Sequence, residues 1–331
     1  MRMAKINWGV LSTARIGTEK VIPAMQRGQY TSITAIASRK LASAQQAAKK
    51  LGIAKAYGSY EELLADDDIQ AIYISLPNHL HVEWTLKALR AGKHVLCEKP
   101  IAINARDAEY LQEEAQKFPK LKLMEAFMYR HHPQTIGVKK LVDSGAIGEV
   151  RHIHAMFSYY NDNPQDIRNQ ADIGGGGLLD IGCYCISLSR FLFDVEPQRV
   201  CGAVEYDPKM RTDRLVSGIL DFPKGSSTFS CSTQLPPYQY AKVFGTQGFL
   251  EIETPFTPAP DRPSKVIRHS REKVEEIVFA PYDHYTIQGD SFSRAILENA
   301  PVPTPIEDGV ANMKVIDGIS ESSRSGSWVE L

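Results

Sequence analysis

The chain has 331 residues, a length that suggests about two domains. Hydrophobic residues make up 43% of the sequence and charged residues 23%, a balance typical of globular proteins and not of disordered chains. The 38 Lys and Arg residues are balanced by 39 Asp and Glu residues, so no positive excess indicates a nucleic acid or an anionic membrane as partner.

The N-terminal part of the chain, to about residue 125, alternates strand patterns with helix patterns. We expect strands at residues 6–11, 32–38, 71–76, 94–97 and 121–126. We expect helices at residues 15–27, 42–51, 60–65, 81–91 and 105–118. Near-continuous apolar strands separated by helices predict an α/β domain with a doubly wound parallel sheet of the Rossmann type.

The pattern changes near residues 127–133, where we place the boundary between a domain 1–128 and a domain 129–331. A helix is expected at 134–144, and strands at 150–159, 199–206, 215–222, 226–234, 239–245, 249–254, 265–269 and 274–279. Further helices are expected at 177–193, 285–298 and 307–323. The last of them can pack against the first domain. Short turns between consecutive strands predict an α+β domain with a large, mostly antiparallel sheet.

No feature of the chain predicts export or membrane insertion. No uninterrupted apolar run approaches the length of a membrane span, and residues 1–8 leave no room for a leader peptide. The five cysteines form no C-x-x-C pair, which favours reduced and mostly buried thiols. We therefore expect a cytoplasmic protein, and we predict no metal site.

The turn after the first strand is a candidate phosphate-binding turn. A dinucleotide-binding unit usually has G-x-G-x-x-G between its first strand and first helix, because small residues let the backbone approach a pyrophosphate. Here only Gly17 keeps its place, and the turn before it consists of Ser12, Thr13, Ala14, Arg15 and Ile16. We expect these five residues to bind the cofactor; a tight turn without a ligand is the alternative.

The end of the second strand predicts which dinucleotide binds. An Asp or Glu usually follows this strand when the cofactor is NAD, but here Ser38, Arg39 and Lys40 take that place. No acidic residue occurs between residues 20 and 60. A carboxylate would repel a 2′-phosphate, whereas Arg39 can bind the phosphate and stack on adenine. We therefore predict NADP(H) as the cofactor, with all three residues near its adenosine end.

The third polar turn follows the strand 71–76. Ligands of parallel sheets bind at the carboxyl ends of the strands, so Leu76, Pro77 and Asn78 are expected near the cofactor. His81 belongs to the same candidate set, although it opens a helix and could equally have a structural role.

Glu98 and Lys99 follow the strand 94–97 and carry opposite charges at the end of a buried strand. Burying a charge without a partner is costly, so either the two form an ion pair at a domain edge or they contact ligand. In the second case Glu98 binds a ribose hydroxyl of the cofactor and Lys99 lies at the reacting centre.

A run of four glycines at 174–177 precedes Asp180 and Tyr184. If the segment is helical, these two side chains are at i and i+4 and share one face. A polar pair at the start of an otherwise apolar helix is unusual for pure packing. A tyrosine hydroxyl can accept or donate a proton in catalysis if its pKa, ordinarily about 10, is lowered.

Two of these motifs together resemble the Gfo/Idh/MocA family of oxidoreductases. They are G-K-H-V-L-C-E-K-P at residues 92–100 and G-G-G-x-L-L-D-I-G-x-Y at residues 174–184. The resemblance implies that the first domain binds a nicotinamide cofactor, that Lys99 is catalytic and that the Lys99–Pro100 bond is cis. It also implies that the sheet of the second domain holds substrate and forms a homodimer or homotetramer.

Tyr184 stands at the position where many members of the family carry a histidine. In this respect the sequence resembles the subgroup of glucose–fructose oxidoreductase, aldose and xylose dehydrogenases and dihydrodiol dehydrogenases. That subgroup implies hydride transfer between NADP and a sugar or polyol, with Lys99, Asp180 and Tyr184 as catalytic and substrate-binding residues. Arg130 and Arg168 resemble family positions near the substrate, and Arg168 is also a candidate cofactor contact; inter-domain salt bridges are the alternative for both.

Reduction of a keto-sugar, including a nucleotide-linked one, or oxidation of a trans-dihydrodiol also fits the same motifs. A regulator that binds NADP without turnover is a different class of function. It would require damage to the catalytic set, whereas Lys99, Asp180 and Tyr184 are all intact.

Overall fold

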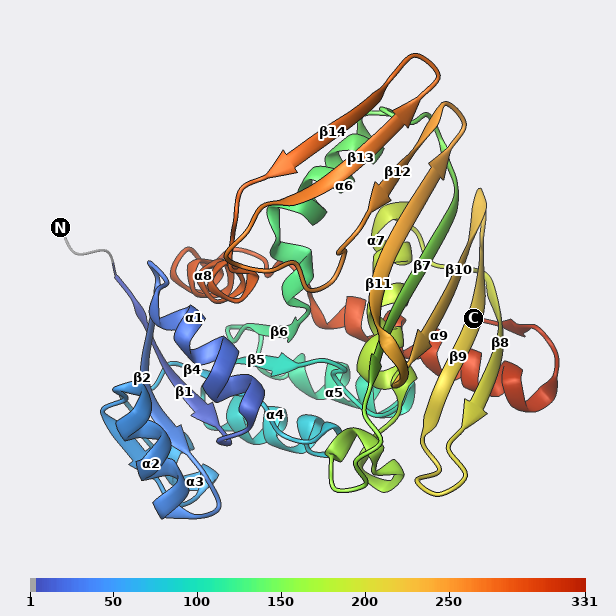
Figure 1. Cartoon of the computed structure of the whole chain (residues 1–331). Coiled ribbons are helices and arrows are strands. Elements are labelled where there is room, and N and C mark those ends of the chain that lie inside the picture. Colours follow the sequence, from blue (N-terminus) through green and yellow to red (C-terminus); the bar gives the residue numbers. More distant parts are fainter. Residues whose placement is uncertain (1–3) are drawn as a thin grey trace. The chain divides into compact units, whose positions relative to one another are not determined.

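The computed structural model describes residues 4–331, and the chain divides into two compact units (Figure 1). The first unit contains the described residues up to Ala102 together with Arg106–Met128 and Asp283–Val310. The second contains Ile103–Ala105, Tyr129–Tyr282 and Ala311–Leu331. Each unit has its own sheet.

The first unit is built on a six-stranded parallel sheet with the strand order β3-β2-β1-β4-β5-β6. Its strands are β1 (Ile6–Leu11), β2 (Thr31–Ala37), β3 (Lys55–Tyr57), β4 (Ala71–Ile74), β5 (His94–Glu98) and β6 (Leu123–Ala126). This order reverses between β1 and β4, the point at which doubly wound sheets bind their ligands. The predicted Rossmann class is confirmed; β3 is the strand that the sequence did not locate.

Helices connect these strands close to the predicted bounds. They are η1 (Gly17–Val21), α1 (Ile22–Gln26), α2 (Leu41–Leu51), α3 (Tyr60–Leu64), η2 (Asn78–Leu80), α4 (His81–Arg90), α5 (Ala105–Ala115) and, from the C-terminal part of the chain, α8 (His284–Leu297). The segment η1 is π-helical and leads directly into α1, so the helix after β1 starts with a wide turn. Single π turns inside helices are frequent at functional sites.

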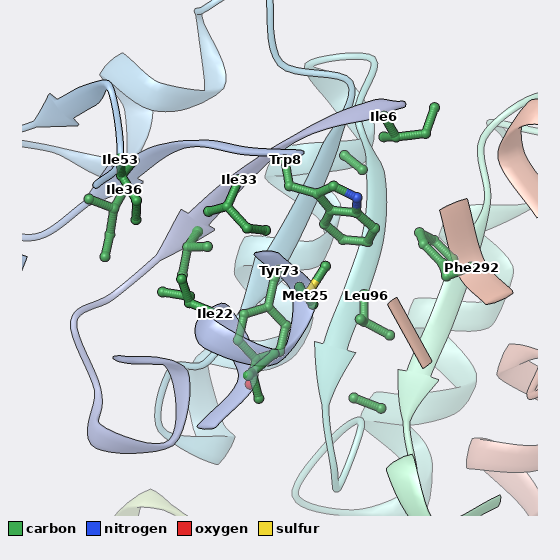
Figure 2. Packing of buried hydrophobic residues seen from close by; sticks show 14 of the residues in the cluster. Ile6, Trp8, Ile22, Met25, Ile33, Ile36, Ile53, Tyr73, Leu96 and Phe292 are labelled. Atoms are coloured by element: carbon green, nitrogen blue, oxygen red, sulfur yellow. The ribbon is translucent and has the colours of Figure 1, made fainter. Parts of the chain in front are cut away.

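The core of the first unit joins the sheet to α8 (Figure 2). Trp8 is fully buried, and its ring centroid lies 5.5 Å from that of Phe292 on α8. The Trp8 indole N–H donates to the Ser293 hydroxyl at 3.0 Å, which satisfies its polar atom inside the core. Asp290 accepts the backbone N–H groups of Gln29 and Tyr30, both at 2.9 Å. These contacts make α8 part of the first unit, although it is remote in sequence.

The second unit is built on a nine-stranded sheet with the order β14-β13-β12-β11-β7-β10-β9-β8-β15 (Figure 1). Its strands are β7 (Val150–Tyr160), β8 (Arg199–Tyr206), β9 (Asp213–Phe222), β10 (Gly225–Ser232), β11 (Gln234–Gly245), β12 (Gly248–Ile252), β13 (Ser264–Ser270), β14 (Val274–Phe279) and β15 (Val329–Glu330). Neighbours are antiparallel except for the pair β7–β10, so the predicted mostly antiparallel sheet is confirmed.

The remaining helices include one that is mostly buried, formed by η6 and α7 and called the buried helix below. They are η3 (Met128–His131), α6 (Pro133–Asp143), η4 (Ile167–Asn169), η5 (Ala171–Ile173), η6 (Leu178–Gly182), α7 (Cys183–Phe193) and α9 (Ile306–Ser325). The π segment η6 continues into α7, and a Cβ on Gly182 would lie 2.9 Å from Cys231 Sγ on β10. The stretch Ala171–Phe193 is long and apolar enough to cross a membrane. However, 78% of its most apolar 18 residues are buried inside the protein, as in a core helix.

Candidate active site

The turn between β1 and η1 has the geometry of an anion-binding turn. Ser12 has a φ of 91°, in the region that favours glycine, and its hydroxyl accepts the Ala14 N–H at 3.0 Å. Helical backbone begins at Arg15, whose exposed guanidinium pairs with Glu19 at 3.2 Å. Because the first N–H groups of a helix have no partner within it, the turn from Ser12 to Ile16 fits the pyrophosphate of a dinucleotide. Thr13 lies within this turn.

Tyr60 connects this turn electrostatically to Arg39. Its phenol is hydrogen-bonded to the Ser12 side chain and lies within reach of the Arg39 charge. Burial raises the pKa of Tyr60, while Arg39 and the bond to Ser12 act in the opposite direction. The Arg39 and Lys40 side chains are exposed, and Ser38 is half-buried at the end of β2. A cationic pair beside the candidate pyrophosphate turn fits the extra phosphate of an NADP molecule.

His81 joins the ends of β4 and β5. It is fully buried, and its two ring nitrogens lie 2.8 Å from the Leu76 carbonyl oxygen and 2.7 Å from the Pro100 carbonyl oxygen. Burial lowers the pKa of His81. Both nitrogens thus lie against backbone carbonyl oxygens, and a neutral ring donates its single N–H to one of the two. His81 therefore bridges the two turns and shapes them. Pro77 and Asn78 are half-buried in the turn that it holds.

The segment from Glu98 to Ile101 is held by buried side chains of the sheet. The fully buried Tyr73 donates its hydroxyl to Glu98 Oε1 at 2.6 Å, and the Ile101 N–H donates to Glu125 Oε1 at 2.8 Å. Burial raises the pKa of Tyr73 well above its ordinary value, and the Glu98 charge adds to this. The bond Lys99–Pro100 is cis, as the resemblance implied.

In the second unit, Asp180 is the centre of a polar cluster at the start of the buried helix. Its Oδ2 accepts the Tyr159 hydroxyl at 2.6 Å and lies 3.3 Å from Arg168 Nε. Arg168 also contacts Asp166 at 3.3 Å. Burial raises the pKa of Tyr159, with a further contribution from the Asp180 charge, and that charge also raises the pKa of Arg168. The cluster therefore holds the carboxylate of Asp180 in one orientation.

Tyr184 lies in an aromatic cluster of the same unit. The residue is 5% exposed, and its ring packs against Tyr129, Phe157 and Phe256, with centroid distances of 5.6, 5.7 and 5.7 Å. The Tyr129 hydroxyl donates to Ser187 at 2.8 Å. Rings on three sides restrict the directions in which the Tyr184 phenol can point, which suits a group that must meet a substrate atom.

Arg130 lies against α7. Its guanidinium stacks on the Phe191 ring at 3.9 Å, and Nη1 donates to the Ser187 hydroxyl at 3.3 Å. Cation–π stacking fixes the plane of the guanidinium. A substrate contact for Arg130 stays a prediction.

Sequence reasoning missed the side chains that support these candidates. Tyr60, Tyr73 and Tyr159 each donate or accept a hydrogen bond with a candidate residue, but they belong to segments that read as ordinary apolar helix or strand. The one available signal is for Tyr159, which shares a strand face with Phe157 at the end of β7.

Two family models match the chain. One, described as "Oxidoreductase family, NAD-binding Rossmann fold", matches residues 6–127, and the other, described as "GFO/IDH/MocA C-terminal domain", matches residues 136–251. The first match covers the whole parallel sheet, and the second covers β7–β11 of the large sheet together with Asp180 and Tyr184.

Similar proteins of known name include sugar oxidoreductases. A D-xylose 1-dehydrogenase (NADP(+)) of Haloferax volcanii is 38% identical over 98% of this chain and 99% of its own. A crystallised 3-ketoreductase from Actinomadura kijaniata in complex with NADP and TDP-benzene is 31% identical, with a TM-score of 0.89 over 96% of this chain and 98% of its own. An aldose-aldose oxidoreductase from Caulobacter crescentus is 25% identical, with a TM-score of 0.91 over 99% of this chain and 100% of its own.

We predict that Tyr159→Phe lowers the free energy of unfolding by about 2 kcal/mol, because the variant removes a hydrogen bond to a charged, buried acceptor. Urea unfolding at pH 7 measures the loss. Tyr160→Phe is the matched control, since Tyr160 is the exposed next residue and its hydroxyl bonds weakly to Asp162 at 3.3 Å. Equal stabilities of the two variants would contradict a structural role of the Tyr159–Asp180 bond.

Proposed function

Because this chain belongs to the Gfo/Idh/MocA family of oxidoreductases, we propose that it transfers a hydride between NADP and a sugar or polyol, as an aldose dehydrogenase or oxidoreductase. The observation that carries the proposal is that Asp180, whose carboxylate Tyr159 and Arg168 orient, lies in the same continuous helix as Tyr184. Such a carboxylate can accept a hydrogen bond from a sugar hydroxyl, and a phenol one turn later can exchange its proton.

The first unit supplies the cofactor contacts in this proposal. The turn from Ser12 to Ile16 holds the pyrophosphate, Arg39 with Ser38 and Lys40 holds the 2′-phosphate, and Glu98 accepts from a ribose hydroxyl. The turn from Leu76 to Asn78 lies beside the cofactor, with His81 shaping it. When bound, the nicotinamide supplies the hydride acceptor or donor.

Tyr184 and Lys99 share the proton transfer. In oxidation, the deprotonated oxygen of Tyr184 takes the proton from the substrate hydroxyl and becomes a hydroxyl, and in reduction that hydroxyl gives its proton to the carbonyl oxygen. The Lys99 ammonium favours the deprotonated phenol and can donate to the substrate oxygen, because a nearby positive charge stabilises an anion. Arg130 and Arg168 contribute to the walls of the substrate site, and the protein works in the cytoplasm.

Reduction of a keto-sugar is the second candidate function. It is supported by the likeness to the 3-ketoreductase that was crystallised with NADP and TDP-benzene. An assay with aldoses, polyols, trans-dihydrodiols and keto-sugars, each with both cofactors, distinguishes these activities. A regulator without turnover is disfavoured because Lys99, Asp180 and Tyr184 are all present.

We expect the protein to prefer NADP over NAD, and Arg39→Ala to raise the Michaelis constant for NADP about tenfold to hundredfold, because a charge-assisted contact to phosphate is lost. The constant for NAD should change far less. Steady-state kinetics with both cofactors measures this, and Lys49→Ala on the exposed face of α2 serves as the control for a simple loss of charge. Equal use of the two cofactors by the unmodified protein refutes the assignment.

Tyr184→Phe should leave cofactor binding nearly intact and lower turnover by about 10²- to 10⁴-fold, because only the hydroxyl is removed. Lys99→Ala should lower turnover in the same way and raise the pH at which the remaining activity increases. Fluorescence titration with NADPH and initial rates measure the two quantities. Tyr129→Phe is the control, since its hydroxyl bonds to Ser187 in the same aromatic cluster. Near-full turnover of Tyr184→Phe would exclude Tyr184 as the acid/base.

The assembly part of the proposal concerns the sheet face opposite α7. A hollow of about 900 Å³ on this sheet is lined by side chains of β7, β11, β12 and β13, among them His154, Tyr238 and Tyr240. Tyr238 is 58% exposed, and its ring lies 5.5 Å from that of Tyr240. A sheet whose second face carries exposed aromatic rings needs cover, and a second copy of the chain supplies it.

We therefore predict a homodimer or homotetramer by light scattering at micromolar concentration. Tyr238→Asp should raise the dissociation constant at least about tenfold, because it puts a charge into the buried interface. Val195→Asp, in the exposed turn after α7, is the control. A monomeric mass for the unmodified protein would contradict assembly through this face.

A further inference from the structure

The glycine run of the second unit is folded tightly against a carboxylate from a distant strand. The N–H groups of Gly175 and Gly176 donate to the carbonyl oxygens of Gln170 and Arg168 at 2.9 and 2.8 Å. Gly176 has a φ of 130°, and a Cβ on it would lie 1.9 Å from Asp213 Oδ1. Glycine at this position therefore allows a close approach to Asp213 that any side chain would prevent.

Asp213, the first residue of β9, caps the buried helix from outside its own segment. Its Oδ2 accepts the Leu178 N–H at 2.5 Å, and its carboxylate also accepts the Gly177 N–H. Leu178 is 35 residues away in sequence, so this is a long-range contact and not a local helix cap. The first N–H groups of a helix lack partners within it and favour a negative charge, which makes the carboxylate a strong anchor.

The cap is connected to the candidate catalytic residues through one hydrogen bond. The Asp180 N–H donates to the Gly176 carbonyl oxygen at 3.1 Å, and Tyr184 follows one turn later in the same continuous helix. A shift of the Gly176–Leu178 turn would thus move the backbone of Asp180 directly. Misplacement of a catalytic group by about 1 Å can cost about a hundredfold in rate.

From this geometry we infer that Asp213 is a positioning residue: its carboxylate fixes the helix start from which Asp180 and Tyr184 project. The inference deepens the proposed function and rests on it for the catalytic meaning of those two side chains. It assigns a role to a half-buried carboxylate that acts on Asp180 and Tyr184 by way of the Gly176–Leu178 turn.

The charges around Asp213 make the cap sensitive to pH. Burial, with a smaller contribution from the Asp180 charge, raises the pKa of Asp213 to about 7 against the lowering effect of the N–H donors. Cys231 on β10 faces it as a neutral thiol whose own pKa is raised well above its ordinary value. Arg214 on β9 is paired with Glu205 at 2.8 Å. The carboxyl group accepts both N–H groups fully when ionised, so the cap weakens as the pH falls through about 7.

The test compares Asp213→Asn with Asp207→Asn. The first variant keeps the shape but turns an NH₂ group, which cannot accept, toward one of the two N–H groups. Asp207 is the control because its carboxylate accepts the N–H groups of Lys209 and Met210, at 2.8 and 2.9 Å, without touching the glycine run. Hydrogen–deuterium exchange of residues 177–182 should accelerate at least about tenfold in Asp213→Asn and stay unchanged in Asp207→Asn.

The second measurement follows Tyr184 itself. In NMR spectra of protein with isotope-labelled tyrosine rings, the resonance of Tyr184 is assigned by its loss in Tyr184→Phe. This resonance should shift in Asp213→Asn and not in Asp207→Asn. Turnover of Asp213→Asn should fall about tenfold to hundredfold, with cofactor affinity unchanged. The rise in activity between pH 6 and 8 that ionisation of Asp213 causes in the unmodified protein should be absent from the variant.

The outcomes separate the two proposals. Unchanged exchange at residues 177–182, or an unmoved Tyr184 signal with full turnover, would overturn the role of Asp213. If the unmodified protein reduces or oxidises none of the sugars tested, the proposed function fails, while the exchange and the Tyr184 signal still decide whether Asp213 positions the helix.

Discussion

The first N–H groups of a helix have no acceptor within the helix, and both units of this protein are built around that constraint. In each unit a tight turn leads into a π-helical segment and then into an α-helix: η1 into α1, and η6 into α7. In each case the first N–H groups need an acceptor that the helix cannot supply. In the first unit the geometry fits a phosphate ligand, and in the second the acceptor is the carboxylate of Asp213.

This difference explains why the two turns have different compositions. The first turn is built from Ser12, Thr13 and Ala14, with Ser12 in a left-handed conformation that its own hydroxyl bond to Ala14 supports. The second is built from consecutive glycines, because an internal carboxylate lies against Gly176 and leaves no space for a Cβ. A turn that faces a ligand tolerates small side chains, whereas a turn pressed against its own protein does not.

Much of the fold could be predicted from the sequence because its elements carry clear hydrophobic patterns. Buried strands such as Ala71–Ile74 are short apolar runs, and the motifs with Lys99 and Tyr184 mark the end of a strand and the start of a helix. The two missed strands, Lys55–Tyr57 and Val329–Glu330, have only three and two residues and carry no alternation to detect. Asp213 and Tyr159 were missed for another reason: their partners lie 35 and 21 residues away, so only the folded chain brings them together.

We propose that this chain moves a hydride directly between a sugar carbon and the nicotinamide of NADP. The most direct measurement supplies an aldose that carries deuterium on C1 together with unlabelled NADP, and analyses the nicotinamide product by mass spectrometry and proton NMR. We expect NADPH that carries one deuterium at C4, on a single face of the ring. Sugar oxidation that left the nicotinamide unlabelled, or no conversion of any aldose, polyol or keto-sugar, would contradict it.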